Sequence, residues 1–305
     1  MNLSQFFDIN LLNSLLRFIA PVLLAALGGL ICTQAGVMNI ALEGLMVIGA
    51  FFAVWFSFAF HSAALGIFGA VLGSVFISVI FGLFAIKLKG NKIVLGIALN
   101  LFCSGITVYL LRTIFNTKGA FQDPSIIGLP DFEIPFIKDI PFLGPLLSGH
   151  NLLIYLSLVL VMLITLLLYK HRIGLRLRGI GQYPVAAQSL GVNVHLYQFG
   201  AVILSGVLCG LSGAQLSLGN VRLFVENMSA GRGWIAVAAV MLGQANPISV
   251  FIACIVFGFS DAISGRLQTI GVPIELAQSL PYLVTLLSLM IIHFRKKQHN
   301  TLFDM

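Results

Sequence analysis

Charged side chains are scarce in this sequence, at 9% of its 305 residues, whereas soluble globular domains carry about 25%. Hydrophobic residues make up 59% of the chain, and the mean hydropathy is +1.03. One globular core cannot hide that much apolar surface, because a large share of any folded chain still faces its solvent. The composition excludes a soluble domain and predicts an all-α polytopic membrane protein.

Familiar chemical motifs are absent as well. The sequence has no phosphate-binding G-x-x-x-x-G-K-[ST], no H-E-x-x-H, no C-x-x-C and no G-x-S-x-G. Its few cysteines all lie in apolar stretches, which favours small buried side chains over disulfides or metal ligation: Cys32, Cys103, Cys209 and Cys254. We expect no catalytic residue, no metal and no cofactor, and we assign any ATP hydrolysis to a separate subunit.

The apolar residues gather into stretches long enough for a membrane-spanning helix, which takes about 20 residues. Eight stretches qualify: 11–32, 36–60, 63–87, 93–115, 151–169, 197–218, 248–266 and 276–294. A ninth, 233–243, is short and has glycine-rich flanks, so it either extends into those flanks or is a broken helix lining a cavity. We expect about nine transmembrane helices, with a range of eight to ten, in a single domain over residues 1–305.

Lysine and arginine set the predicted orientation, because these residues concentrate in short cytoplasmic loops. With nine crossings and an outer N-terminus, ten of the seventeen basic residues are cytoplasmic, at 87–92, 170–178 and 295–297. The net charge of +7 is then explained by topology and anionic headgroups rather than by nucleic-acid binding. We predict an outer N-terminus and a cytoplasmic C-terminus, and Asp8 and Arg17 argue against a cleavable signal.

Two loops stand out between the predicted spans. Loop 116–150 contains four acidic residues and five prolines, which predicts an irregular extracytoplasmic cap that meets a soluble partner or serves only as a spacer. Loop 170–196 is basic, with turn signals at Gly179, Gly181 and Pro184 and a short helical stretch that Gly191 ends. A helix between spans on the basic side is suited to docking a soluble partner, so we interpret 170–196 as a cytoplasmic coupling loop.

This topology makes spans one to four and six to nine run in opposite senses, with the fifth span between them. Such inverted halves are common in transporters, whose substrate path lies at the interface of the halves near the membrane midplane. The halves show no convincing sequence identity, so the prediction rests on topology alone.

Polar residues inside the predicted spans are candidates for the translocation path. A carboxylate at mid-membrane costs about 2.5–3.5 kcal/mol on insertion scales, so Glu43 is expected either to line the path or to act as a helix-end cap. Asn39 lies four residues earlier, and on one helix the two residues share a face. Asn100 either lines the path or hydrogen-bonds a neighbouring helix.

Two further candidates lie later in the chain. Asp261 is poorly spaced for a same-helix pair with Arg266, so we expect either a polar contact across helices or a place on the path. Trp234 lies in 231–243, whose small residues allow close helix packing and whose short length also suits a path-lining role.

Three motifs in combination carry a resemblance. They are GVMNIALEGLMVIGA at 36–50, GLRLRGIGQYPVAAQSLGVNV at 174–194, and GRGWIAVAAVMLGQANP at 231–247 taken with LPYLVTLL at 280–287. Over about residues 12–294 the chain resembles the permease subunits of bacterial ABC importers of the branched-chain amino acid, ribose and nucleoside group. It looks most similar to the nucleoside (simple sugar) branch.

The resemblance implies an inverted-repeat permease bundle of the bacterial plasma (inner) membrane. The implied partners are an ATP-binding cassette ATPase, a second homologous permease and an extracytoplasmic solute-binding lipoprotein. The implied coupling residues are Arg178, Gly181, Pro184, Ala186, Ala187 and Gly191. Where similar loops carry acids, this chain has Gln182, Val185 and Gln188, so either its ATPase-facing surface differs or the second permease supplies acidic contacts.

The implied solute is a nucleoside or a related heteroaromatic compound, with riboflavin or a simple sugar as the alternative. An ion-coupled secondary transporter is a separate hypothesis, because intramembrane carboxylates can carry protons. That hypothesis leaves the basic loop without a role, and a membrane enzyme is disfavoured by the missing catalytic motifs.

Overall fold

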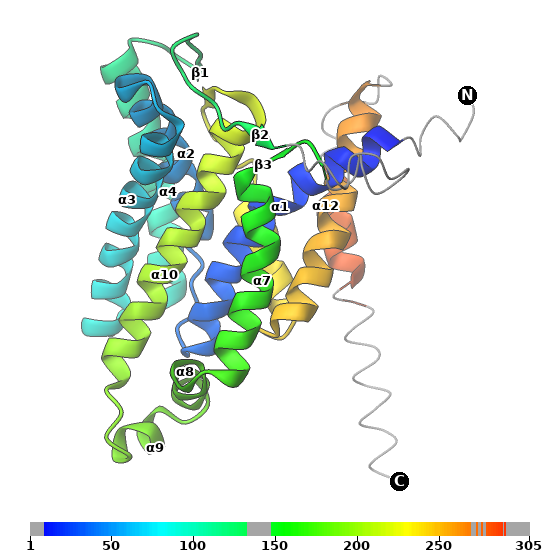
Figure 1. Ribbon diagram of the computed structural model, residues 1–305. Helices are drawn as coiled ribbons and strands as arrows, with labels where there is room; N and C mark the ends of the chain where they lie inside the picture. The colour runs from blue at the N-terminus through cyan, green and yellow to red at the C-terminus, as the bar shows by residue number, and fades with distance from the viewer. Residues whose placement is uncertain are drawn as a thin grey trace.

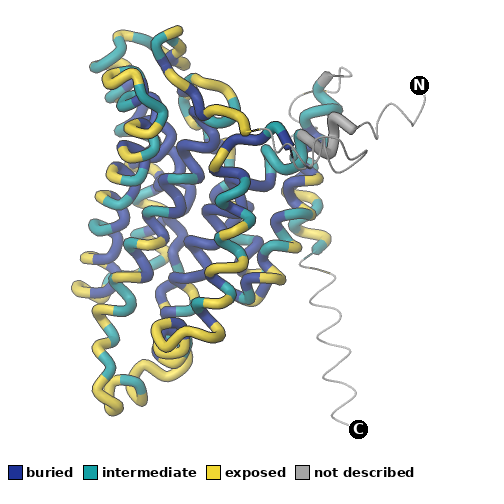
Figure 2. Tube along the Cα trace, viewed as in Figure 1, coloured by how far each residue is buried: buried dark blue, intermediate teal, exposed yellow. Residues whose placement is uncertain are grey.

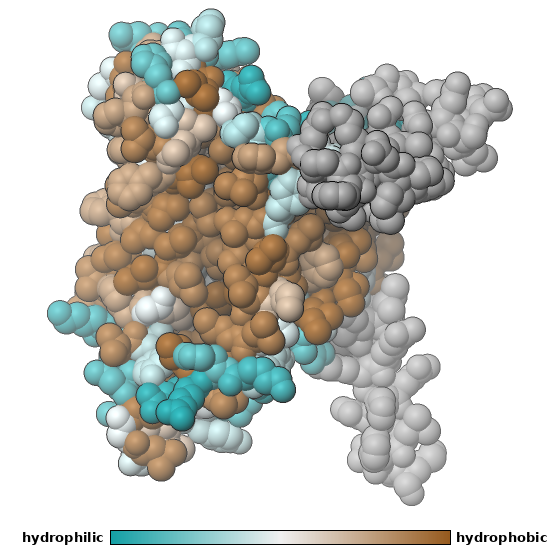
Figure 3. All heavy atoms as spheres, in the orientation of Figure 1, coloured by the Kyte–Doolittle hydropathy of each residue, from teal (hydrophilic) through white to brown (hydrophobic). Residues whose placement is uncertain are grey.

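Long apolar helices run between two polar ends in the computed structural model, which describes residues 9–132, 148–269, 273, 276, 279–288 and 290 (Figure 1). Figure 3 shows an apolar band between two hydrophilic ends, as expected of a protein that crosses a bilayer. Seven described helices are long and apolar enough to cross: Ser14–Gln34, Leu42–Phe60, Ala63–Lys87, Lys92–Phe115, Leu152–Lys170, Val194–Val221 and Pro247–Gln268. Two shorter apolar helices, Arg232–Leu242 and Ser279–Ser288, lie where the remaining predicted spans were expected.

The elements follow one another with short connections over most of the described chain. In order they are α1 (Ile9–Gln34), α2 (Leu42–Phe60), α3 (Ala63–Gly82) with a π-helical end (Leu83–Lys87), α4 (Lys92–Phe115), β1 (Ala120–Phe121), β2 (Asp131–Phe132), β3 (His150–Asn151), α7 (Leu152–Lys170), α8 (Arg172–Gln182), α9 (Pro184–Ser189), α10 (Val194–Ala214) with a π-helical end (Gln215–Val221), β4 (Phe224–Val225), α11 (Arg232–Leu242) and α12 (Pro247–Thr269). Two antiparallel pairs, β1 with β4 and β2 with β3, lie at what we call the strand end. The opposite end carries α8 and α9, which we call the arm, and this end is called the arm end (Figure 1).

Helices α1 and α10 form the centre of the bundle. In the membrane-spanning part of α1, 83% of the residues are buried, and in that of α10 78% are (Figure 2). The corresponding shares are 17% for α4 and 28% for α7. The core around α1 consists of branched and small apolar side chains such as Leu23, Leu27 and Leu30, all fully buried. The outer faces of α4 and α7 are therefore free to meet lipid or another subunit.

Glycines on one face of α10 allow this central position. A Cβ at Gly210 would lie 2.7 Å from the Ala70 carbonyl oxygen of α3, and one at Gly206 would lie 2.6 Å from the Ser78 Cβ. A Cβ at Gly213 would meet the backbone of α2 at Met46. Small residues at a helix interface let backbones approach closely, and here they let α10 pack against α2 and α3 at once.

The two halves pack with inverted correspondence. Helix α10 packs on α3 and α2, and α1 packs correspondingly on α12 and α11. Both α1 and α10 are followed by a non-helical stretch, 35–41 and 222–231, before a helix restarts as α2 or α11. The predicted inverted-repeat bundle is confirmed, with α7 as the link between the halves.

Two local predictions are wrong. The span predicted for 36–60 becomes helical only at Leu42, so Asn39 precedes the helix and does not share a helical face with Glu43. Gly179 and Gly181, expected in a turn, lie within α8, because the chain breaks only at Tyr183 before Pro184. The predicted bounds at 63–87, 93–115 and 151–169 agree with the helices to within one residue.

Candidate functional site

The starts of α2 and α11 meet at the carboxylate of Glu43, which lies in the first turn of α2. Its Oε1 accepts hydrogen bonds from the Gly231 backbone N–H at 2.8 Å and from the Ser229 hydroxyl, and its Oε2 accepts one from the Gly233 N–H at 2.6 Å. A helix N-terminus carries unpaired N–H groups and a positive partial charge, so α11 stabilises the carboxylate. Glu43 is 9% exposed, and both of its oxygens are occupied within the protein.

Close backbone approach makes this arrangement possible. A Cβ at Gly233 would lie 2.5 Å from the Glu43 Cα, so only glycine fits where α11 meets α2. Gly231 has φ +82°, which favours glycine and turns the chain into α11. We call this contact, made of Glu43, Ser229, Gly231 and Gly233, the carboxylate lock.

An ion pair is formed by the first residue of α11, Arg232. The Arg232 guanidinium donates to Asp261 Oδ2 of α12 from Nε at 3.1 Å and from Nη2 at 2.9 Å. The side chains are 20% and 21% exposed, so the pair is largely shielded from solvent. The expected polar contact of Asp261 across helices is confirmed, with Arg232 as the partner that the sequence did not reveal.

The stretch 35–41 is non-helical backbone between two membrane-spanning helices. Such backbone is tolerated inside a membrane only when its polar groups find partners within the protein. Asn100 of α4 supplies two of them: its Nδ2 donates to the Ile40 carbonyl at 3.0 Å, and its Oδ1 accepts from the Gly44 N–H at 2.8 Å. The Asn39 Oδ1 accepts from the Ala41 N–H at 3.0 Å, and its Nδ2 donates to the Ser205 hydroxyl oxygen at 3.1 Å. Both asparagines are buried and hold the start of α2 in place.

Residues 34–36, at the arm end of this stretch, are hydrogen-bonded to several helices. The Lys92 Nζ donates to the Gly36 carbonyl at 2.7 Å, the Gln198 Nε2 to the Ala35 carbonyl at 3.2 Å, and the Gln34 Nε2 to the Ala245 carbonyl at 2.6 Å. These bonds join α4, α10 and the α11–α12 turn at the end of α1. We call residues 34–36 the hub.

Helix α8 packs directly on the hub. A Cβ at Gly181 would clash with the Gln34 carbonyl oxygen and would lie 3.2 Å from the Gly36 nitrogen. Gly36 itself has φ +75°, and a Cβ there would lie 3.3 Å from the Gly181 Cα. Two glycines thus place the arm in backbone contact with the stretch that leads to the carboxylate lock.

Helix α9 forms the outermost part of the arm and has no buried residue. Pro184 opens the helix, Ala186 and Ala187 lie in its middle, and Gly191 ends it with φ +78°. The Gly191 N–H donates to the Gln188 carbonyl at 2.9 Å, which confirms the predicted stop. The apolar side chains around α9 face outward, with exposed fractions of 73% for Tyr183, 76% for Val185 and 84% for Leu190.

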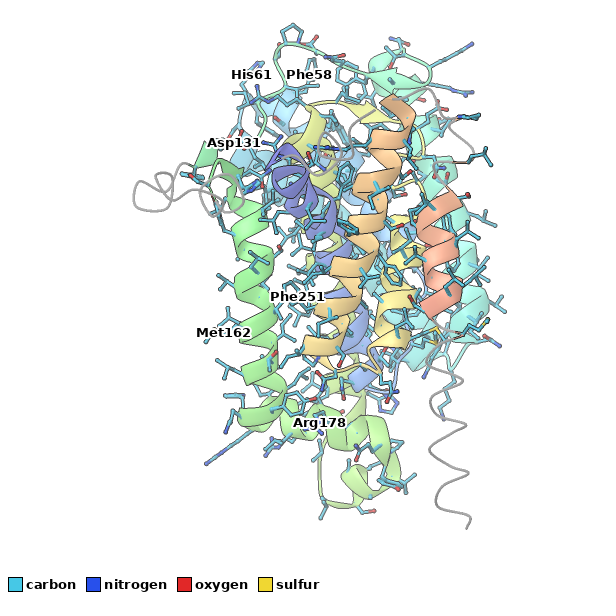
Figure 4. All side chains as sticks on the ribbon, turned by 90° about the vertical axis from the view of Figure 1, so that its right-hand side faces the viewer. Phe58, His61, Asp131, Met162, Arg178 and Phe251 are labelled. Atoms are coloured by element: carbon cyan, nitrogen blue, oxygen red, sulfur yellow. The ribbon has the colours of Figure 1, made fainter. Side chains whose placement is uncertain are left out.

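The remaining predicted residues lie near this framework. Arg178 lies on α8 at the arm end (Figure 4), with its guanidinium 4.5 Å from the ring centroid of Tyr169, a cation–π contact that joins α8 to α7. Trp234 is 42% exposed on α11, whereas Asn39, Glu43 and Asn100 are buried. The Trp234 side chain therefore lies partly at the surface of the subunit, whereas the three polar side chains lie in its interior.

Two cavities adjoin the framework. One of about 290 Å³ lies between α1, the 38–42 stretch and α11, and its lining includes Thr33, Met38, Asn39, Val237, Met241 and Gln244. The other, of about 560 Å³, lies at the arm end, and its lining includes Gln34, Tyr169, Arg178, Gln182, Gln244 and Asn246. Both are lined by Gln244 and Ala245, so they meet at the α11–α12 turn.

Comparisons with known proteins agree with this architecture. The model of the family described as branched-chain amino acid transport system / permease component matches residues 11–291. The nucleoside ABC transporter permease protein NupC of Lactococcus lactis subsp. cremoris is 33% identical and covers 95% of this chain and 93% of its own. The guanosine ABC transporter permease protein NupQ of Bacillus subtilis is 32% identical, with 90% of this chain and 89% of its own covered.

A solved structure supports the fold. The inward-facing conformation of an ABC transporter described as metal-chelate type matches with a TM-score of 0.50 and 16% identity, and the match covers 90% of this chain and 84% of that one. At that identity the likeness bears on the helix arrangement alone.

Proposed function

This chain belongs to the family of branched-chain amino acid transport system permease components, and we propose that it is the membrane subunit of an ATP-driven importer for nucleosides. Two similar proteins are named as nucleoside and guanosine permeases, and each matches this chain over most of both lengths. The proposed reaction is transport, with ATP hydrolysis by a separate ATP-binding cassette subunit. A second permease and an external solute-binding protein complete the proposed assembly.

One structural observation carries the mechanical part of the proposal: the glycine contact between Gly181 of the arm and Gly36 of the hub. From Gly36 the chain runs through the 37–41 stretch to Glu43, whose carboxylate holds the start of α11. A displacement of α8 is therefore transmitted to the starts of α2 and α11, through the covalent chain and through direct contacts. We propose that ATPase closure moves α9 and that this route opens and closes access between the halves.

The proposed orientation places the arm end in the cytoplasm. The arm end carries Lys170, Arg172, Arg176 and Arg178 without an acid among them, as expected for a cytoplasmic loop. The strand end, with part of loop 116–150, then faces outward toward the solute-binding protein. The N-terminus is outside and the C-terminus cytoplasmic in this orientation.

We propose different roles for the candidate path residues. Glu43, Asn39 and Asn100 hold the walls of the path, because their polar groups are engaged by the protein. Asp261 positions the start of α11 through Arg232. Trp234 faces the path, since its ring is exposed beside the same helix start.

The experiment is ATP-dependent guanosine uptake by the complete transporter in proteoliposomes. The methyl group of Gly181→Ala would clash with the backbone carbonyl of Gln34. Overpacking of this kind costs about 1–3 kcal/mol of stability. We expect it to lower uptake while the protein still inserts into the membrane. Gly179→Ala is the matched control on the same helix, because nothing lies within 4 Å of a Cβ there.

The same preparation tests the energy source. Uptake is expected to vanish when the P-loop lysine of the ATPase is replaced. Uptake by this chain alone, driven by a pH step, would instead establish a secondary transporter. Equal uptake by the Gly181→Ala and Gly179→Ala variants would remove the arm–hub contact from the mechanism.

A further inference from the structure

The cavity between α1 and α11 and the cavity at the arm end are neighbours on the subunit, since Gln244 and Ala245 line both. The upper part, of about 290 Å³, has mostly apolar walls, with Met38 from the non-helical stretch and Met241 from α11. The lower part, of about 560 Å³, is lined by polar groups that include the Arg178 guanidinium, the Tyr169 side chain and the side-chain amides of Gln34, Gln182, Gln244 and Asn246. We call the two parts together the α1–α11 groove.

The groove exposes polar side chains, which a lipid-facing surface disfavours. Thr33 and Gln244 are exposed at the upper part, and polar side chains in contact with hydrocarbon are costly. Trp234 is exposed on α11, two turns before Met241. The exposed face of the peripheral helix α7 is apolar by contrast, with Val159, Met162 and Leu163 each more than half exposed.

The two parts of the groove suit the two parts of one kind of molecule. Thioether sulfur makes favourable contacts with aromatic rings, so the methionines of the upper part suit a flat heteroaromatic ring. Amides both donate and accept hydrogen bonds and the Arg178 guanidinium donates them, so the lower part suits a hydroxyl-rich group. Within the described chain, no acidic side chain is among the lining residues of either part.

We propose that the α1–α11 groove is a solute-binding site that takes the base of a nucleoside between Met38 and Met241 and its ribose among the amides. This inference deepens the proposed function, on which it rests, by naming where the solute is held and by which residues. Thr33 provides a hydrogen-bonding group beside the ring: its hydroxyl donates to the Gly29 carbonyl at 2.9 Å and leaves the oxygen free to accept.

The first test is thiol accessibility, for which the chain is well suited. All four native cysteines are fully buried, so Met241→Cys adds a surface thiol to a chain whose own thiols are shielded. Met241 is 58% exposed in the groove, and Met162 is 67% exposed on α7, so Met162→Cys is the matched control (Figure 4). We expect a charged, water-soluble thiol reagent to modify Met241→Cys and not Met162→Cys, and guanosine to slow the modification.

The second test is guanosine uptake by the complete transporter carrying Met241→Ala or Thr33→Val. We expect KM to rise about fivefold in each, as loss of one contact of about 1 kcal/mol gives. Met162→Ala and Thr165→Val are the controls, since the Thr165 hydroxyl makes the same kind of bond to its own helix, to the Val161 carbonyl at 2.6 Å. These controls are expected to keep the wild-type KM.

The outcomes separate this inference from the function on which it rests. If the wild-type transporter imports guanosine but Met241→Cys is unreactive like Met162→Cys, or reacts without protection by guanosine, the groove is not the site. If the wild-type transporter fails to import guanosine, the proposed solute is wrong. Protection together with a selective rise in KM supports the groove.

Discussion

The α1–α2 junction and the α10–α11 junction occupy corresponding places in the two inverted halves, yet they are held in different ways. The first is fixed by side chains of other helices: Asn100 of α4, Ser205 of α10 and Lys92 of α4. The second begins beside the strand pair at the strand end and closes on the Glu43 carboxylate of the first. The second junction therefore shares a carboxylate with the first, and Asp261 of α12 supports it as well.

The charged residues at the two helix starts also differ in sign. Glu43 lies at the start of α2 and Arg232 at the start of α11, and each is followed by a glycine that permits close packing, Gly44 or Gly233. The carboxylate faces the N-terminus of α11, where negative charge is stabilised. The arginine, whose positive charge is unfavourable at a helix N-terminus, is compensated by Asp261. Substitutions can therefore measure what each junction contributes to stability and uptake.

The largest effect is expected from Glu43, which serves both junctions. Glu43→Ala leaves the Ser229 hydroxyl and the Gly231 and Gly233 N–H groups without their acceptor. Each unsatisfied buried donor costs about 1–3 kcal/mol, so the total loss is about 3 kcal/mol or more. We expect a large drop in the thermal midpoint of the purified protein and a loss of uptake.

Glu226→Ala is the control for this prediction. Glu226 also accepts a backbone N–H bond, from Gly119 at 3.1 Å, but it lies at the strand end with a side chain that is 29% exposed. Water can replace that bond, so the thermal midpoint is expected to change little. Equal losses for the two variants would show that Glu43 has no special role in joining the halves.

The sequence was sufficient for the positions of the spans and insufficient for the junctions. Hydropathy located 63–87 and 93–115 because each side chain contributes to that signal independently of its neighbours in space. Whether 36–41 is helical depends on Asn100, Ser205 and Lys92, which lie far away in the sequence and supply the bonds that a helix would otherwise make. No periodicity records such partners.

The candidate site shows the same limit from another side. An intramembrane carboxylate marked Glu43 as important, but its partners are mostly backbone N–H groups, which have no sequence signature. The run S-A-G-R-G at 229–233 was the available signal, since two glycines around a basic residue are unusual at the start of a helix. Gly181 was identified from a motif, and its contact with the hub became visible only in the structure.

An intermediate effect is expected at the first junction alone. Asn100→Ala removes the acceptor of the Gly44 N–H and the donor to the Ile40 carbonyl, for a cost of about 2 kcal/mol or more. Asn100→Asp keeps an acceptor for the Gly44 N–H but turns a carboxylate oxygen toward the Ile40 carbonyl, so its thermal midpoint is expected to fall at least as far as that of Asn100→Ala. A thermal midpoint of Asn100→Asp well above that of Asn100→Ala would show that the bond to the Ile40 carbonyl contributes little to the junction.

The smallest effect is expected at the second junction, where Arg232 and Asp261 compensate one another. Arg232→Met or Asp261→Leu alone leaves one charge without its partner, whereas the double variant removes both charges and replaces them with apolar groups. We expect the double variant to be more stable than either single one, with a coupling free energy of about 1–3 kcal/mol in a double-mutant cycle. Additive single effects would mean that the pair does not position α11.

Uptake by that double variant decides between the two roles considered for Asp261. If the carboxylate only holds the start of α11, a folded double variant retains most of its guanosine uptake, because the apolar pair restores the packing without the charge. If Asp261 contacts solute on the path, uptake stays low even though stability has recovered. The first junction allows no such separation, since Glu43 bonds directly to the backbone of α11 and any replacement disturbs both helix starts. The second junction is therefore the place where holding the fold and contacting the solute can be measured independently.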